Sequence, residues 1–227
     1  MTRTEVIQKI IDKKKAGNYL EIGTASGANF LPIVSRRKVA VDPCFSISPG
    51  RRALWTLRNF SNVFAKYYET TSDAYFSRST VRFDVVFIDG LHTYEQSLKD
   101  VLGSLAILNG NGVIVMHDCN PPNKAAAHPA LSYEHAASLK LPGWNGEWCG
   151  DVWKTVCHLR SKRKDLRVFV LDCDFGLGIV TKGSPDSCLG LSEERLKALT
   201  YEDLESDRRN LLNLKDDSHL LEFLETI

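Results

Sequence analysis

Short apolar runs alternate with amphipathic stretches along most of the chain. The runs Tyr19–Ile22 and Val39–Val41 predict two strands covered on both faces. A helix is expected between them, from Gly27 to about Ser35. Phe83–Asp89 is the clearest buried strand, and an amphipathic helix is expected after it at Tyr94–Leu108. Repeated strand–helix units predict a parallel sheet joined by right-handed crossovers.

The rest of the pattern completes this arrangement. Helices are also expected at 4–15, 51–59 and 151–160, strands at 63–68 and 113–118, and two antiparallel strands at 166–171 and 178–181. We therefore expect an α/β fold with a doubly wound, mostly parallel, seven-stranded Rossmann-like sheet and a C-terminal antiparallel hairpin. Residues 1–183 form the predicted domain, with 119–150 as a substrate or lid loop, and 184–227 form a helical extension. In that extension Thr200 is expected to cap a helix, with Asp203 three residues later.

Carboxylates and glycines fall where the predicted strands end, which is the ligand-binding edge of an α/β sheet. Glu21 ends the first strand and opens a Glu-x-Gly-x-x-x-Gly stretch that closes at Gly27, and Asp42 ends the second strand. Glycines let the backbone approach a ligand, and an acidic residue about 20 positions later binds ribose hydroxyls. A dinucleotide fingerprint starting at Gly23 would need glycine where Ala25 stands. The pattern therefore favours a nucleoside ligand without a pyrophosphate over NAD.

Together with Ser72-Asp73 and the strand Phe83–Gly90, these motifs make the chain resemble class I S-adenosylmethionine-dependent methyltransferases over roughly residues 18–182. The resemblance implies that the glycine loop contacts the amino-acid part of the cofactor and that Asp42 binds both ribose hydroxyls. It also implies that Ser72-Asp73 flanks the adenine. The cofactor-binding residues implied in this way are Glu21, Gly23, Thr24, Ala25, Ser26, Gly27, Asp42, Ser72, Asp73 and Asp89.

A second group of polar residues marks the reacting end. Asp89 and His92 follow one predicted strand, and His117 and Asp118 close the next. Because neighbouring parallel strands end at one edge, we expect these groups to converge. Asp89 and His92 are the candidate catalytic residues, with His92 as the base. Asp89, His117 and Asp118 are candidate ligands for Mg²⁺ or Mn²⁺, which would lower the pKa of a bound hydroxyl.

This second group resembles the site of metal-dependent O-methyltransferases of sugar and macrolide tailoring. In that pattern a carboxylate pair follows the fifth strand, whereas His117 precedes Asp118 here, so the sequence leaves the presence of a metal open. A related branch resembles cephalosporin hydroxylases on a similar fold. The alternatives that stay open are therefore a hydroxylase, an NAD-type oxidoreductase and a non-catalytic nucleoside-binding protein.

Aromatic residues gather in the long segment after the fifth strand. Trp144 and Trp148 are candidates for a lid, with Tyr133, His128 and His135 as further members of an aromatic wall over the crevice. Trp153 is expected instead to belong to the core of the following helix. The segment thus predicts a cover that excludes water from the site.

Composition narrows the partners. The formal net charge is +1, which is not typical of a nucleic-acid-binding protein, and no apolar run is long enough to span a bilayer. Six cysteines show no Cys-x-x-Cys pair, and the polar first residues are not typical of a secretory signal. We therefore expect a cytoplasmic enzyme that acts on a small molecule such as a sugar, with no nucleic-acid or membrane partner. A homodimer is a candidate assembly.

Overall fold

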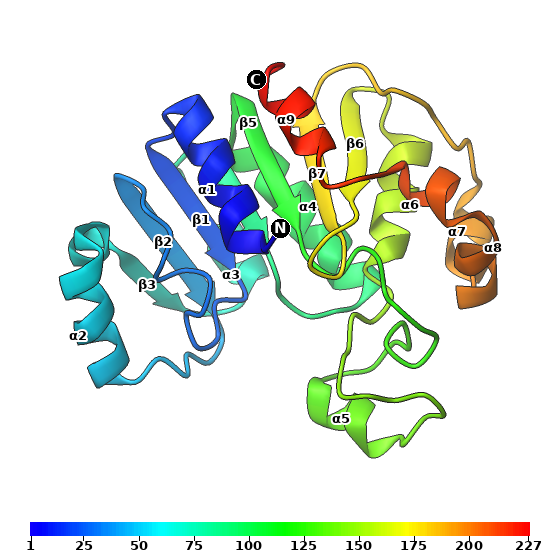
Figure 1. Ribbon diagram of the computed structural model, residues 1–227, viewed down its shortest axis with the longest axis horizontal. Coiled ribbons are helices and arrows are strands. Elements are labelled where there is room, and N and C mark those ends of the chain that lie inside the picture. The colour runs from blue at the N-terminus through cyan, green and yellow to red at the C-terminus, as the bar shows by residue number, and fades with distance from the viewer.

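One sheet holds all eight strands of the computed structural model, which describes residues 1–227 (Figure 1). Its order is β3-β2-β1-β4-β5-β7-β6-β8. The strands are β1 Asn18–Ile22, β2 Arg37–Asp42, β3 Lys66–Glu69, β4 Phe83–Ile88, β5 Leu108–Met116, β6 Leu166–Leu171, β7 Leu177–Lys182 and β8 Leu214–Lys215. Every neighbouring pair is parallel except the two that β7 makes, because β7 runs antiparallel to both β5 and β6.

The expected α/β sheet with its antiparallel hairpin is confirmed, but the expected number of seven strands is wrong. The eighth strand, β8, comes from the C-terminal extension and pairs with β6 through Val170 and Leu171. It has only two residues, which is too short to produce an alternating pattern in the sequence.

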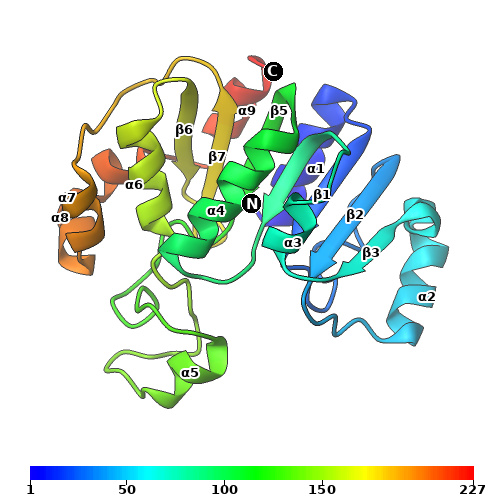
Figure 2. The same ribbon diagram turned by 180° about the vertical axis from the view of Figure 1, so that it is seen from behind.

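Helices cover both faces of the sheet (Figures 1 and 2). They are α1 Arg3–Lys14, α2 Pro49–Arg58, a 3₁₀ helix η1 Phe60–Phe64, α3 Ser72–Phe76, α4 Tyr94–Ile107, α5 Tyr133–Ser138, α6 Trp153–Lys162, α7 Glu193–Ala198, α8 Tyr201–Leu212 and α9 His219–Leu224. One apolar cluster joins α3, α4, α6, α7 and α8 to the sheet, and a second joins α1 and α9 to the opposite face.

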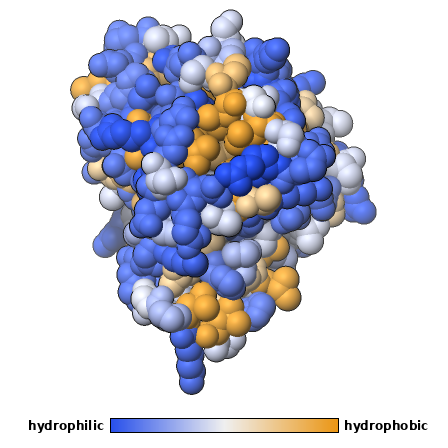
Figure 3. Space-filling model, turned by 90° about the vertical axis from the view of Figure 1, so that its right-hand side faces the viewer, coloured by the Kyte–Doolittle hydropathy of each residue, from blue (hydrophilic) through white to orange (hydrophobic).

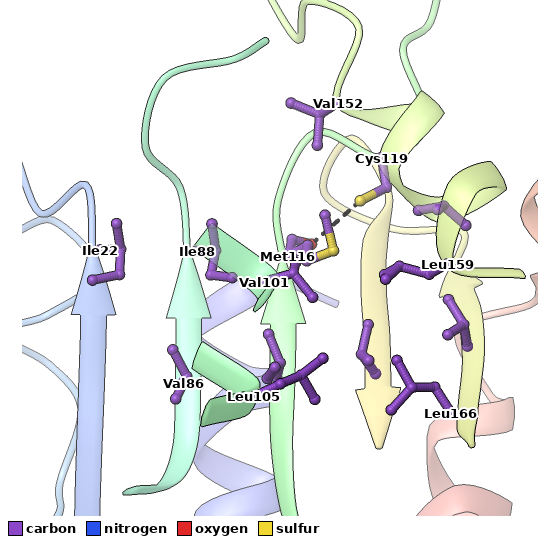
Figure 4. Packing of buried hydrophobic residues seen from close by; sticks show 14 of the residues in the cluster. Ile22, Val86, Ile88, Val101, Leu105, Met116, Cys119, Val152, Leu159 and Leu166 are labelled. Carbon is purple, nitrogen blue, oxygen red and sulfur yellow. Dashed lines mark hydrogen bonds between the residues drawn. The ribbon is translucent and has the colours of Figure 1, made fainter. Parts of the chain in front are cut away.

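Successive strand residues alternate between these two clusters, as the pleat requires. On β4, Val86 and Ile88 belong to the first cluster, and Val85 and Phe87 belong to the second. Figure 4 shows part of the first cluster, with Val101 and Leu105 of α4 among the side chains of β4 and β5. The strands are therefore apolar on both faces, which explains why their sequences read as unbroken apolar runs.

No helix forms between Gly27 and Ser35, so this expectation is wrong. The segment runs as a series of turns. Pro32 has no N–H to donate, which disfavours a helix through it. The carbonyls of residues 31–33 instead accept hydrogen bonds from Asn59 Nδ2 at 2.8–3.1 Å. Lys38 Nζ donates to the carbonyls of Phe30 and Ile33 in the same segment, at 2.8 Å each.

The C-terminal extension packs against the sheet. The predicted cap is confirmed, since Thr200 and Asp203 form a reciprocal capping box at the start of α8. Leu204 and Leu212 of α8 are buried in the first cluster, and Phe223 of α9 is buried in the second. Trp153 is also fully buried in the first cluster, as expected for a core residue. None of the helices combines the length and the apolar composition needed to cross a bilayer.

Candidate active site

A cavity of about 840 Å³ lies at the carboxyl ends of β1, β2, β4 and β5. This is the edge at which open α/β sheets bind ligands, and the volume is in the range of a small-molecule site. The predicted site residues that line it are Gly23, Ala25, Asp42, Ser72, Asp73, Asp89, His92, His117 and Asp118. The structure therefore brings both predicted groups of polar residues into one cavity.

The backbone fixes the carboxylate of Asp42 at one end of this cavity. Its Oδ2 accepts a hydrogen bond from the N–H of Ala25 at 2.7 Å, and its Oδ1 accepts one from the N–H of Cys44 at 2.8 Å. Each oxygen keeps a further lone pair for a ligand hydroxyl. Asp42 is only 8% exposed, so its carboxylate is rigid and partly desolvated before any ligand binds.

Gly23 brings the end of β1 directly against the end of β4. Its φ is +81°, and a Cβ added there would come within 1.9 Å of the carbonyl oxygen of Asp89. Only glycine tolerates both the left-handed backbone and this contact. The close approach joins the end of the cavity at Asp42 to the end that carries Asp89.

Four predicted cofactor residues do not line the cavity: Glu21, Thr24, Ser26 and Gly27. Glu21 is buried beneath the loop, where its Oε2 accepts hydrogen bonds from Tyr19 Oη at 2.6 Å and Asn29 Nδ2 at 2.7 Å. Burial raises the pKa of Glu21 to about 8. In this structure the side chain of Glu21 bonds Tyr19 and Asn29 rather than the glycine loop, and a Cβ on Gly27 would meet the side chains of Leu31 and Ile47.

Ser72 lies beside a buried carboxylate that the sequence analysis missed. Ser72 Oγ donates a hydrogen bond to Asp100 Oδ1 at 2.6 Å, and Gln96 Nε2 donates to the same oxygen at 3.0 Å. Burial raises the pKa of Asp100 to about 6 despite these two hydrogen bonds. Gln96 and Asp100 are four residues apart on α4, and both line the cavity. Their spacing of four residues on a helix was the signal in the sequence that could have placed both side chains on the same face.

At the other end of the cavity, His92 lies between two carboxylates. Its Nε2 is 3.4 Å from Asp89 Oδ1 and 3.2 Å from Asp118 Oδ2. Its Nδ1 is 2.9 Å from the carbonyl oxygen of Trp148, which can only accept, so Nδ1 carries a hydrogen. In the neutral ring the lone pair is therefore on Nε2. Burial opposes the charged ring, but Asp89 and Asp118 outweigh it and raise the pKa of His92.

His117 has carboxylates at both ring nitrogens. Nδ1 is 2.9 Å from Asp118 Oδ2 and 3.3 Å from Asp89 Oδ1, and Nε2 is 3.4 Å from Asp174 Oδ1. Burial opposes the charge on His117, but the charges of Asp89 and Asp118 raise its pKa well above the ordinary value. A carboxylate faces each ring nitrogen, so these surroundings favour the protonated ring, in which both nitrogens donate.

Arg3 completes this charged cluster, and nothing in the sequence pattern indicated it. Its Nη1 donates to Asp89 Oδ2 at 2.8 Å, and its Nε is 3.3 Å from Asp174 Oδ2. Arg3 is the first residue of α1, which leads into β1 through a short reversal, so the start of α1 lies at the carboxyl edge of the sheet (Figure 1). Burial opposes ionisation of Asp89, but His117 and His92 outweigh it and hold the pKa of Asp89 well below its usual value.

A divalent cation fits part of this cluster. The ligand atoms of Asp89, His92 and Asp118 all lie within 4.8 Å of one another. Two carboxylates and one imidazole are suitable ligands for Mg²⁺ or Mn²⁺. The predicted ligand His117 is not in this group, because its two nitrogens already donate to carboxylates. The structure thus replaces His117 by His92 in the candidate metal set.

The segment after β5 covers the cavity with aromatic groups. The ring of Trp148 lies over His92, with centroids 4.9 Å apart, and its Nε1 donates to the carbonyl oxygen of His128 at 2.9 Å. Tyr133 also lines the cavity and packs against Trp144, which does not line it. Of the two tryptophans proposed for a lid, Trp148 is therefore the one at the site.

Comparisons with known proteins agree with this geometry. Residues 20–119 match a family model described as a methyltransferase domain. No curated protein sequence matches the chain significantly.

Several solved structures, some of them described as methyltransferases, have the same fold. Cofactor-bound Rv0187 from MTB is 13% identical, with a TM-score of 0.57 over 80% of this chain and 81% of that one. The O-methyltransferase TomG from Streptomyces achromogenes, solved with SAM, is 12% identical, with a TM-score of 0.56 over 80% of each chain. The SAH-bound methyltransferase PaMTH1 from Podospora anserina is 18% identical, with a TM-score of 0.56 over 80% of this chain and 78% of that one. The predicted resemblance to methyltransferases is therefore confirmed at the level of the fold and of the family model over residues 20–119.

Proposed function

We propose that this protein is an S-adenosylmethionine-dependent methyltransferase that transfers the methyl group of its cofactor to a hydroxyl of a small-molecule acceptor. The observation that carries the proposal is a single cavity with Asp42 at one end and His92 at the other. Gly23 brings the two ends together by its contact with Asp89. A cofactor that extends between these ends would place its methyl group near His92.

The cofactor end has polar groups that suit a nucleoside. Asp42 would accept hydrogen bonds from both ribose hydroxyls, since each of its oxygens keeps a free lone pair. Ser72 and Asp73 would flank the adenine, and the backbone at Gly23 and Ala25 would contact the amino-acid part. Glu21 would act indirectly, through its hydrogen bonds to Tyr19 and Asn29.

His92 is suited to remove the proton of the acceptor hydroxyl. The carbonyl of Trp148 keeps the hydrogen on Nδ1, so Nε2 is the atom that accepts the proton. Asp118 and Asp89 then stabilise the imidazolium. Holding the alkoxide and the methyl carbon in contact would supply much of the rate increase, and Trp148 would help to exclude water.

A metal would change the role of His92. When bound, Mg²⁺ or Mn²⁺ lowers the pKa of a coordinated hydroxyl. Asp89, His92 and Asp118 would hold it, and the lone pair of His92 Nε2 would then be a ligand. The two roles are separable by chelation: turnover that survives EDTA supports the base, and turnover restored only by Mn²⁺ or Mg²⁺ supports the metal site.

The aromatic cover indicates the kind of acceptor. Tyr133, Trp148 and Phe175 line the cavity beside polar groups, a combination that binds sugar rings and flat aryl rings. We therefore propose that the acceptor is a hydroxylated small molecule with such a ring.

All six cysteines are free thiols, which agrees with a reducing, cytoplasmic location.

The test combines cofactor binding with turnover. We expect calorimetry to show that S-adenosylmethionine binds. In a separate turnover assay with hydroxylated ring compounds as acceptors, we expect S-adenosylhomocysteine to be released. His92→Gln should lower kcat by at least about 100-fold while cofactor affinity stays within about twofold. His158→Gln is the matched control, since His158 lies outside the cavity and bonds Tyr94 Oη. Tight NAD binding without S-adenosylmethionine binding would overturn the proposal. Full activity of His92→Gln would contradict only the role of His92 as the base and would leave the proposed reaction in place.

A further inference from the structure

The helix α2 and the 3₁₀ helix η1 expose a group of large apolar side chains at the β3 end of the sheet. We call this group the α2 patch; it consists of Leu54, Leu57, Phe60, Val63 and Phe64. Leu57 is 87% exposed, Phe60 73% and Phe64 66%. No residue of α2 is buried. Figures 1 and 2 show α2 at this end of the sheet with no other helix beside it.

The backbone under the α2 patch is held firmly, so the exposed side chains have a fixed position. Asn59, between α2 and η1, is buried and bonds the carbonyls of residues 31–33. Asn62 is also buried and donates to the carbonyls of Leu31 and Trp55. The polar residues of this segment thus face the protein, and the apolar residues face the solvent.

The segment around the α2 patch carries only positive charge. Residues 43–68 contain Arg51, Arg52, Arg58 and Lys66 and no aspartate or glutamate, in a chain with a formal net charge of +1. None of these four side chains forms an ion pair. Arg51 and Arg58 are seven residues apart, so they lie along the same side of α2 as Leu54. The partner of this surface must therefore supply negative charge as well as apolar contact.

These requirements distinguish between partners. Two copies of the chain that meet through the α2 patch about a twofold axis would bring like charges together. A nucleic acid would supply the charge, but only Phe60 and Phe64 of the patch have a ring on which a base could stack, and the aliphatic Leu54, Leu57 and Val63 do not. An anionic lipid bilayer satisfies both requirements, because headgroups attract arginine and the acyl region accepts leucine and phenylalanine. The opposite side of the molecule is mostly hydrophilic, with hydrophobic residues in separate patches (Figure 3).

We propose that the α2 patch and its arginines bind the protein peripherally to the surface of an anionic bilayer. The inference is independent of the methyl-transfer reaction. It departs from the expectation of no membrane partner, which considered only segments that span a bilayer. It deals with a contact in the headgroup region, which needs an exposed apolar face and flanking cations rather than about 20 apolar residues.

The test is flotation of the full chain with two kinds of vesicle. We expect binding to phosphatidylcholine vesicles that contain about a third phosphatidylserine, little binding to phosphatidylcholine alone, and loss of binding at about 1 M NaCl. Arg51→Glu and Arg58→Glu together should lower the partition coefficient at least about tenfold. Leu57→Ser with Phe60→Ser should lower it similarly, whereas Leu221→Ser, at a position 60% exposed on α9, is the matched control and should leave it unchanged.

Other results would overturn the proposal. Equal binding to both kinds of vesicle, or no binding to either, would do so. An equal loss of vesicle binding in Leu221→Ser and in the variants of the α2 patch would also overturn it. Light scattering that shows a dimer dissociated by Leu57→Ser would assign the α2 patch to self-association, and patch-dependent binding of single-stranded RNA without vesicle binding would assign it to nucleic acid. Far-ultraviolet circular dichroism of every variant controls for folding.

Discussion

Asp100 allows a quantitative test of how the cofactor end of the cavity is built. Its carboxyl group is 1% exposed and accepts hydrogen bonds from Ser72 and Gln96. Burial raises its pKa from an ordinary 3.8 to about 6. The folded protein therefore binds more protons at Asp100 than the unfolded chain does between these pH values. By linkage, this group stabilises the fold most below pH 3.8, and that contribution is lost as the pH rises to about 6.

The magnitude follows from the size of the shift. A difference of about two pKa units corresponds to about 3 kcal/mol of unfolding free energy. Asp100→Asn keeps an oxygen that can accept from Ser72 and Gln96 but does not titrate. Part of this change occurs below pH 4, so the free energy of unfolding of Asp100→Asn, relative to that of the wild type, should rise by about 2 kcal/mol between pH 4 and pH 7.

Urea unfolding at fixed ionic strength, followed by circular dichroism at pH 4, 5, 6 and 7, measures this difference. Asp73→Asn is the matched control, because Asp73 also accepts from Gln96 but its side chain is 56% exposed. We expect its difference from the wild type to stay within about 0.5 kcal/mol. Parallel pH profiles for Asp100→Asn and the wild type would show that the carboxyl group is not desolvated, and the reasoning would be wrong.

Three further predictions concern stability and are measured by urea unfolding. Gly23→Ala should lower the free energy of unfolding by at least about 3 kcal/mol and abolish cofactor binding, because its Cβ would meet the carbonyl of Asp89. Gly27→Ala should lower it by about 1–2 kcal/mol, because its Cβ would meet only side chains that can move. Asn59→Ala should cost about 2–3 kcal/mol, since it leaves buried carbonyls without donors. Arg3→Met should cost about 1–2 kcal/mol, and Arg3→Lys should recover less than half of it, because one ammonium cannot replace two guanidinium nitrogens. Equal effects within either pair of variants would contradict these assignments.

The sequence predicts the sheet well because its central strands are buried on both faces and so have unbroken apolar runs. It predicts the polar residues at the strand ends for the same reason, since the end of a run marks the edge of the sheet. Asp42, Asp89 and Asp118 all follow such runs, and all line the cavity. The sequence therefore predicts correctly those site residues whose position depends only on the local pattern of apolar and polar residues.

What the sequence did not predict depends on contacts between distant residues. The turns at 27–35 are stabilised by Asn59, whose side chain reaches carbonyls 26 to 28 residues away. Arg3 meets Asp89 across 86 residues. Glu21 was assigned to the cofactor from its place in a motif, but the direction of its side chain is set by Tyr19 and Asn29. None of these contacts leaves a periodic signal.

The ionic cluster around His117 has a consequence for how the enzyme becomes active. Arg3 precedes the first strand, and Asp174 lies between the last two long ones, so the cluster is contributed by nearly the whole length of the sheet-forming chain. A nascent polypeptide could assemble the nucleoside end from its first half alone. The reacting end would stay unfinished until the hairpin of β6 and β7 had docked, so that activity would appear only in molecules whose folding is complete.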